Sequence, residues 1–176
     1  MDLITEKAEQ LAITARWKID APRESVYAIA SDFKAMPTHF PKLAHSVSIL
    51  SQAGNHLKLE AKAASFGRFF PRATILIDVE LIPECGFRAS TFVKTFNTTG
   101  KEQLLLHDSD DSTEIEYTYA VTVKHKWLRP LYGWLVRTFA LPYWKRCYLA
   151  PLTKYAQEHR RSQSLANKAL HTEPQV

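Results

Sequence analysis

Residues 11–33 read LAITARWKIDAPRESVYAIASDF, and the hydrophobic period changes within this stretch. Over residues 11–19, apolar and polar side chains alternate, which is typical of a strand with one buried face. Pro22 then stands where a helix tolerates proline, because the N–H groups of the first turn have no helical partners. Apolar residues at helical spacing follow. We therefore expect a strand over 11–19 and a helix from residue 23 that ends near Asp32.

The chain then continues as a series of short segments. Met36-Pro37 and Phe40-Pro41 confine the next stretch to a second short helix or two turns, since the residue before proline avoids helical backbone. From residue 45 onward the period is two. The predicted strands pass through Val47 and Ile49 and then cover 57–63, 73–81, 87–96, 102–107 and 115–123. Turns rich in Gly, Pro, Asn and Asp separate them, which predicts one antiparallel meander with a single apolar face.

A helical period replaces the strand period near residue 130. Pro130 suits a helix start, whereas Pro142 and Pro151 should kink or interrupt the helix. Residues 162–176 show no sustained pattern and are predicted to be a flexible tail, and residues 1–10 an N-terminal extension. We expect one α+β domain over 11–161, a curved antiparallel sheet wrapped round a long C-terminal helix. A single helix cannot fill the concavity of such a sheet, so an internal apolar cavity is expected between them.

The composition agrees with one folded domain. The chain has 176 residues, of which 45% are hydrophobic and 23% charged, and these values exclude a disordered or low-complexity protein. Cys85 and Cys147 are the only cysteines, which excludes a disulfide scaffold and a four-cysteine zinc site. The first ten residues, MDLITEKAEQ, have neither a basic segment nor an apolar run. No secretory signal is therefore predicted, and we expect a cytoplasmic protein.

Three parts of the chain suggest a family. Residues 19–33, Met36-Pro37 and the run SVSIL at 46–50 resemble the opening of the START-related, birch-pollen-allergen-like superfamily. The likeness is greatest to the polyketide cyclase/dehydrase and lipid-transport group, which includes coenzyme Q-binding proteins. The resemblance implies a helix-grip fold with an apolar ligand cavity between sheet and C-terminal helix. Some members are cyclases and others transfer lipids or chaperone quinones, so the fold alone does not decide the function.

Catalytic motifs are absent from the sequence. There is no G-x-S-x-G elbow, P-loop, G-x-G-x-x-G, H-E-x-x-H or Cys/His ligand spacing. Asp108, Asp110 and Asp111 lack the glycine and the terminal glutamate of a calcium loop, so we interpret them as a solvated hairpin turn. No metal, no cofactor and no catalytic residue is therefore predicted. His39 and His45 could converge near the mouth of the cavity, although ordinary surface histidines are more common.

The candidate ligand-binding residues lie on the expected inner surface. Tyr117 and Tyr119 share a strand face with apolar neighbours, and a buried tyrosine hydroxyl needs a partner that a ligand carbonyl could supply. The pattern does not decide which face of 87–96 points inward. The inward face carries either Thr91, or Phe92 with Arg88 and Lys94 as anchors for an anionic headgroup. The residues predicted to line the cavity are Ile75, Ile77, Thr91, Tyr117, Tyr119, Leu131, Leu135, Phe139, Tyr148 and Leu152.

Positive charge gathers near the C-terminus, where residues 124–161 hold nine Lys and Arg against the single acidic residue Glu158. Tryptophans are interleaved with this charge, as in a helix that lies on a membrane surface. The alternative is the solvated face of a basic helix. The predicted residues in contact with an anionic membrane are Trp127, Trp134, Arg137, Trp144, Lys145 and Arg146. The apolar run is too short for a transmembrane span, and no nucleic acid is expected as a partner.

These features favour a carrier that binds a lipid, an isoprenoid quinone or a polycyclic aromatic molecule. The alternative is a polyketide cyclase, aromatase or dehydratase in which Tyr117, Tyr119 or His39 polarises a carbonyl or moves a proton. An enzyme should show a buried acid or base beside a polar donor, and the sequence displays no clear candidate. A third possibility is an interaction module whose basic helix binds an acidic partner.

Overall fold

The computed structural model describes residues 3–7, 10–63, 73–94, 98–122 and 141–170. Its strands form one antiparallel sheet of eight, in the order β1-β2-β8-β7-β6-β5-β4-β3. The strands are β1 (Leu3–Lys7), β2 (Gln10–Ile19), β3 (Ala44–Ala53), β4 (His56–Ala63), β5 (Thr74–Ile82), β6 (Gly86–Val93), β7 (Thr98–Ser109) and β8 (Ser112–Thr122). Consecutive strands from β3 to β8 pair with one another, which is the predicted meander, and β2 closes onto β8.

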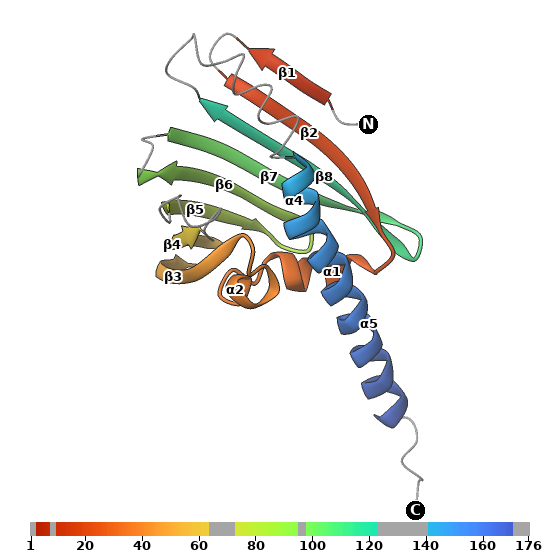
Figure 1. The fold of residues 1–176 in the computed structure, drawn as a ribbon. Coiled ribbons are helices and arrows are strands. Elements are labelled where there is room, and N and C mark those ends of the chain that lie inside the picture. Colours follow the sequence, from red (N-terminus) through yellow and green to blue (C-terminus); the bar gives the residue numbers. More distant parts are fainter. Residues whose placement is uncertain (1–2, 8–9, 64–72, 95–97, 123–140, 171–176) are drawn as a thin grey trace, which may run out of the picture.

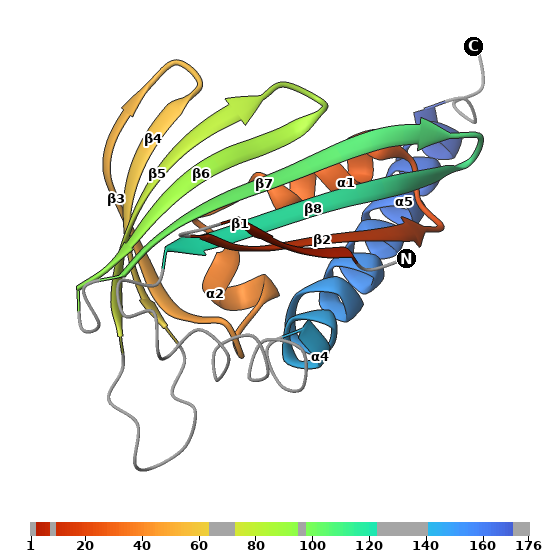
Figure 2. The same ribbon diagram turned by 90° about the horizontal axis from the view of Figure 1, so that it is seen from above.

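The described helices lie on the concave side of the sheet (Figures 1 and 2). They are α1 (Arg23–Ala30), α2 (Met36–His39), α4 (Leu141–Trp144), the π-helical turn η4 (Lys145–Leu149) and α5 (Ala150–Leu170). The sheet curves round α1 and the C-terminal helix, and the far end of α5 extends beyond it (Figure 1). This is the predicted α+β architecture.

Pro151 affects the C-terminal helix without breaking it. Because Pro151 has no N–H, the carbonyl of Cys147, four residues earlier, lacks its usual helical donor. The backbone widens directly before this point into η4, and the N–H of Ala150 bonds to the carbonyl of Lys145. The interruption predicted at Pro151 is therefore a π-helical turn between α4 and α5, a feature common at functional sites.

Three boundaries differ from the predicted ones. Residues 3–7, placed in the N-terminal extension, form the edge strand β1 and pair with β2. Residues 162–170, placed in the tail, continue α5 as a helix, because SQSLANKAL contains no Gly or Pro and several good helix formers. β7 begins at Thr98, four residues before the strand predicted from residue 102.

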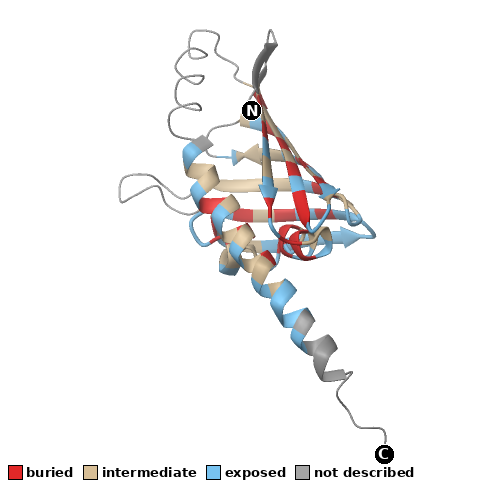
Figure 3. Ribbon diagram, turned by 90° about the vertical axis from the view of Figure 1, so that its right-hand side faces the viewer, coloured by how far each residue is buried: buried red, intermediate tan, exposed pale blue. Residues whose placement is uncertain are grey.

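The core lies between the inner face of the sheet and the helices, and its buried residues follow the alternation of the strands (Figure 3). Val26 of α1, Leu104 of β7, Ile115 of β8 and Leu152 of α5 have essentially no accessible surface. The hydroxyl of Thr113 donates a buried hydrogen bond of 2.7 Å to the carbonyl of Ala21. This bond ties β8 to the turn between β2 and α1.

Candidate functional site

Tyr117 and Tyr119 of β8 point to the inner face, as their alternation predicts. Tyr117 is buried and Tyr119 is half-buried. Tyr117 lies opposite Leu104, and Tyr119 lies opposite Glu102, both on the neighbouring strand β7. The two tyrosines therefore bring their hydroxyls to a part of the sheet that also holds a carboxylate.

Glu102 is the functional candidate that the sequence analysis missed. Its neighbours at two and four residues along β7, Leu104 and Leu106, are buried on the inner face, so Glu102 shares that face. The Tyr117 hydroxyl hydrogen-bonds to its carboxyl group. The sequence does contain a sign of this placement, because Glu102 occupies a position at which the alternation of the strand puts apolar residues. Glu102 itself is half-buried.

Burial controls the protonation of Glu102 and of the tyrosines near it. It raises the pKa of Glu102 to about 7, and the hydrogen bond from Tyr117 offsets only part of this effect. Burial and the charge of Glu102 together hold the pKa of Tyr117 well above its usual range, and the same two causes raise the pKa of Tyr148. Near neutral pH, Glu102 therefore exchanges between acid and carboxylate, while both tyrosines stay protonated.

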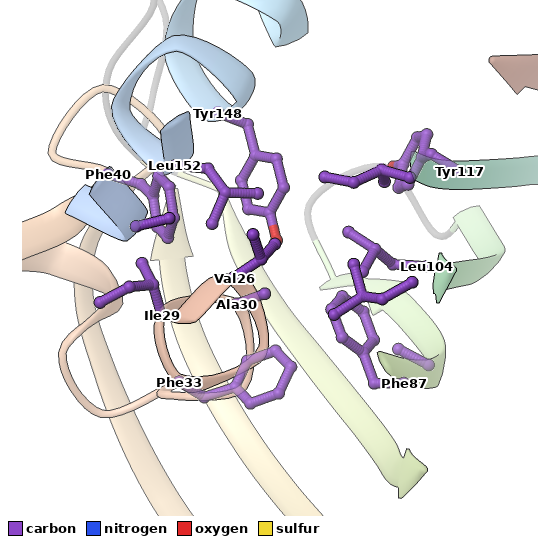
Figure 4. Close-up of a cluster of buried hydrophobic side chains, with 14 of the residues drawn as sticks. Val26, Ile29, Ala30, Phe33, Phe40, Phe87, Leu104, Tyr117, Tyr148 and Leu152 are labelled. Carbon is purple, nitrogen blue, oxygen red and sulfur yellow. The ribbon is translucent and has the colours of Figure 1, made fainter. Parts of the chain in front are cut away.

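Aromatic rings from four elements form a wall that includes Tyr117 and Tyr148. The ring of Trp144 from α4 stacks on Tyr117 at a centroid distance of 4.1 Å and on Trp17 of β2 at 4.9 Å. Its distance to the ring of Tyr148 from η4 is 4.7 Å. The Tyr148 hydroxyl is buried and has no hydrogen-bond partner among the described residues. Figure 4 shows the Tyr148 ring pointing away from the C-terminal helix into the buried cluster, with the hydroxyl at its inner end.

Gly100 gives Tyr119 its position. A Cβ atom at residue 100 would lie 2.8 Å from the Tyr119 hydroxyl and 2.7 Å from Oγ1 of Thr91, both too close for a real contact. The missing side chain therefore lets Tyr119 and Thr91 approach the backbone of β7. We define Glu102, Tyr117, Tyr119 and Tyr148 as the tyrosine–glutamate cluster.

The other predicted lining residues divide into three groups. Ile75, Ile77 and Thr91 are half-buried on the inner face of β5 and β6. Phe87 and Ala89 are buried, which settles the open orientation of β6 in favour of the set with Thr91. Leu152 is fully buried within the core cluster. Leu131, Leu135 and Phe139 lie outside the described residues.

The residues predicted to contact a membrane lie in different surroundings. Trp144 is half-buried, and its ring stacks on Tyr117 and Trp17 in the aromatic wall. Lys145 is half-buried, with its amine 5.9 Å from the centroid of the Trp17 ring, and Arg146 is exposed. Trp127, Trp134 and Arg137 lie outside the described residues.

The two histidines considered for the cavity mouth occupy different surroundings. His39 is half-buried and its ring lies 4.9 Å from that of Tyr155, whereas His45 is exposed on β3. Nδ1 of His39 is buried without a hydrogen-bond partner in the described part of the chain. His39 therefore packs against α5 and is not one of the groups that surround Glu102.

A separate hollow of about 440 Å³ opens on the outer face of the sheet. Its walls include Lys58, Asp78 and Lys101, which point away from the core, together with Leu76 and Phe92 from the same face. This hollow is distinct from the internal cavity that the sequence predicted.

No group of three or more His, Cys, Asp and Glu within the described ranges is arranged to hold a metal ion. No described helix is long and apolar enough to cross a membrane.

Comparison with known proteins identifies the fold. No family model and no curated protein matches the sequence. The Zhui aromatase/cyclase of Streptomyces sp. R1128 matches with a TM-score of 0.66 and 14% identity, over 86% of this chain and 94% of that one. A norcoclaurine synthase point mutant of Thalictrum flavum, in complex with a transition-state analogue, matches with a TM-score of 0.64 and 14% identity. That match covers 88% of this chain and 99% of the synthase.

A third match is Ara h 8.0201, with a TM-score of 0.60 and 12% identity, over 85% of this chain and 99% of that one. Identities this low establish the fold alone. The helix-grip fold predicted from the sequence is thereby confirmed.

Proposed function

We propose that this chain binds an apolar or amphipathic small molecule between the inner face of the sheet and the C-terminal helix. The observation that carries the proposal is the pairing of Glu102 with Tyr117 on an otherwise apolar inner face. Ligand sites are typically apolar surfaces with a few convergent polar groups that orient the ligand. The tyrosine–glutamate cluster has that composition.

The unsatisfied polar atoms support the same proposal. The Tyr148 hydroxyl and Nε1 of Trp17 are buried without partners among the described residues. Each buried polar atom without a partner costs about 1–3 kcal/mol, and a ligand that supplies the partner recovers this cost. Apolar surface removed from water would add about 25 cal/mol per Å². Affinity would come from the apolar body and orientation from the polar groups.

Lipids, isoprenoid quinones and polycyclic aromatic molecules are the ligand classes we propose. Peripheral contact with an anionic membrane remains part of the proposal as the route by which such a ligand enters. Among the described residues, the exposed Arg146 supports it. Charge reversal at Arg146 should then weaken co-sedimentation with phosphatidylserine vesicles at low salt. Binding that does not change with salt or with this variant would exclude such a contact.

A second function has its own supporting observation. Glu102 combines a pKa of about 7 with a hydrogen bond from Tyr117, and a general acid or base works best when its pKa lies near the working pH. This is the buried acid beside a polar donor that an enzyme of this fold requires. In the alternative function, Glu102 moves a proton on the bound molecule and Tyr117 polarises a carbonyl, as in cyclisation or dehydration.

Native mass spectrometry of the freshly purified protein, followed by solvent extraction, tests the proposal. We expect an adduct of small-molecule mass, or saturable one-to-one binding of dodecanol or decylubiquinone detected by tryptophan fluorescence. Absence of both would overturn ligand binding.

The same experiment separates carrier from enzyme. A carrier returns each added compound unchanged, whereas an enzyme returns a product whose formation stops in Glu102→Gln. Glu116→Gln is the matched control, because it removes an equal charge from the opposite face of the sheet, where Glu116 pairs with Arg16.

A further inference from the structure

We infer that the tyrosine–glutamate cluster selects ligands with a protonated amine, and that the site takes an amphipathic amine with an apolar body. The inference rests on the proposed function, because it names the class of ligand for the same site.

Glu102 has no cationic partner in the described part of the chain. The ion pairs found there join residues at the surface, such as Arg16 with Glu116, Lys94 with Glu60 and Arg23 with Asp108. None of these pairs includes Glu102. A desolvated carboxylate without a counter-ion is costly, and a ligand cation is the group that best offsets this cost.

The remaining groups of the cluster suit an ammonium. Three N–H donors on one nitrogen match the acceptors available here, because the Glu102 carboxylate and the Tyr148 hydroxyl oxygen both accept. The Tyr148 hydroxyl is buried without a partner, and it lies near enough to Glu102 for their charges to interact. A ligand carboxylate would instead place a second negative charge beside Glu102, which is unfavourable.

The aromatic wall adds a second attraction for a cation. Ring faces carry negative electrostatic potential, so an ammonium near Trp or Tyr rings is stabilised, most strongly where water is excluded. The rings of Trp17, Tyr117 and Trp144 all contact one another, with centroid distances of 4.1 to 6.2 Å. The amine of Lys145 already lies 5.9 Å from the Trp17 ring centroid, so the wall accommodates one ammonium of this chain.

The pH dependence follows from the groups around Glu102. Tyr117 of β8 and Tyr148 of η4 interact with this carboxyl, and Tyr119 of β8 lies opposite Glu102 in the sheet. Tyr117 and Tyr148 stay protonated around neutral pH, because burial raises the pKa of both hydroxyls. The ionised form of Glu102 binds the amine, so amine affinity should rise with pH through about 7. The affinity of a matched neutral alcohol should not rise.

Isothermal titration calorimetry with two matched pairs tests the inference: tryptamine against tryptophol, and dodecylamine against dodecanol. At pH 8 we expect the amine of at least one pair to bind about tenfold or more tightly than its alcohol, and this ratio to shrink at pH 6. Glu102→Gln should abolish the preference while the alcohol still binds, and Glu116→Gln should keep it.

The outcomes separate the two proposals. Alcohol binding without amine preference in either pair overturns the amine inference and leaves ligand binding intact. A preference that survives in Glu102→Gln also overturns it, because the carboxylate would not be its cause. If none of the four compounds binds in the calorimeter, the amine inference is overturned. If, in addition, neither dodecanol nor decylubiquinone changes the tryptophan fluorescence, the proposed function is overturned as well. Circular dichroism of each variant establishes that it is folded.

Discussion

At the scale of single residues, Glu102 shows how a functional group is held at a cost to stability. Its pKa rises from 4.5 to about 7 in the folded chain, so folding favours the protonated form. The contribution of Glu102 to the free energy of unfolding is therefore fully present below pH 4.5, and it is lost as the pH rises through 7. A shift of this size corresponds to about 3 kcal/mol.

This cost predicts the behaviour of Glu102→Gln. The amide keeps the shape and accepts the Tyr117 hydrogen bond, but it cannot ionise, so the variant should be up to about 3 kcal/mol more stable than the parent at pH 8. At pH 4 the two should be nearly equal. Urea unfolding at both pH values measures the difference. If the free energy of unfolding changes equally with pH in parent and variant, Glu102 is well solvated in the folded chain.

Gly100 is the residue-scale test of Tyr119. Gly100→Ala places a methyl group 2.8 Å from the Tyr119 hydroxyl, so the ring must move toward the interior or away from Thr91. We expect a loss of about 1 kcal/mol in stability and a larger relative loss in dodecanol affinity, measured by tryptophan fluorescence. Tyr119→Phe in the Gly100→Ala background should recover part of the affinity, because it removes the clashing oxygen. If Gly100→Ala binds dodecanol as the parent does, Tyr119 is not part of the site.

At the scale of elements, the strands were predictable because one face of each is buried. Strict alternation fixes which side chains point inward, and that argument placed Tyr117 and Tyr119 correctly. It could also have placed Glu102, but the sequence cannot show that a charged residue within an apolar alternation is desolvated rather than near a sheet edge. The inward turn of Trp144 was not predictable for a different reason. It depends on how the C-terminal helix is rotated over the sheet, and the π-helical turn η4 alters the helical period that a sequence argument assumes.

The hairpin glycines give an element-scale prediction. Gly86 has φ of +128°, and a Cβ there would lie 2.0 Å from the Leu104 carbonyl oxygen of the neighbouring strand. Gly54 has φ of +56° and nothing within 4 Å. Gly86→Ala should therefore cost more than about 3 kcal/mol or prevent folding, whereas Gly54→Ala should cost about 1 kcal/mol from backbone strain. Urea unfolding of the pair checks this order, and similar losses would contradict the close approach of β6 and β7.

At the scale of the whole molecule, the fold separates two surfaces with different chemistry. The outer face of the sheet carries paired charges such as Arg16 with Glu116, which solvent screens. The inner face carries a carboxyl without a described counter-ion, opposite a helix that contributes aromatic rings. Only the closure of the helix over the curved sheet brings Tyr148 to Glu102, since these residues lie on distant parts of the chain. The site is therefore a property of the tertiary fold and not of any short motif.

The same separation predicts which part of α5 the fold needs. Leu152 and Ala156 are fully buried, and Nδ1 of His159 lies 3.4 Å from Oγ of Ser25 in α1. In contrast, Arg161, Ser162 and Gln163 are exposed, and Leu165 is 68% exposed. Deleting residues 163–176 should thus lower stability by less than about 1 kcal/mol, whereas Ala156→Arg should unfold the domain, because it buries a charge between helix and sheet. Thermal unfolding followed by circular dichroism compares the two. A large loss on truncation would mean that the end of α5 stabilises the domain through contacts beyond those of the described residues.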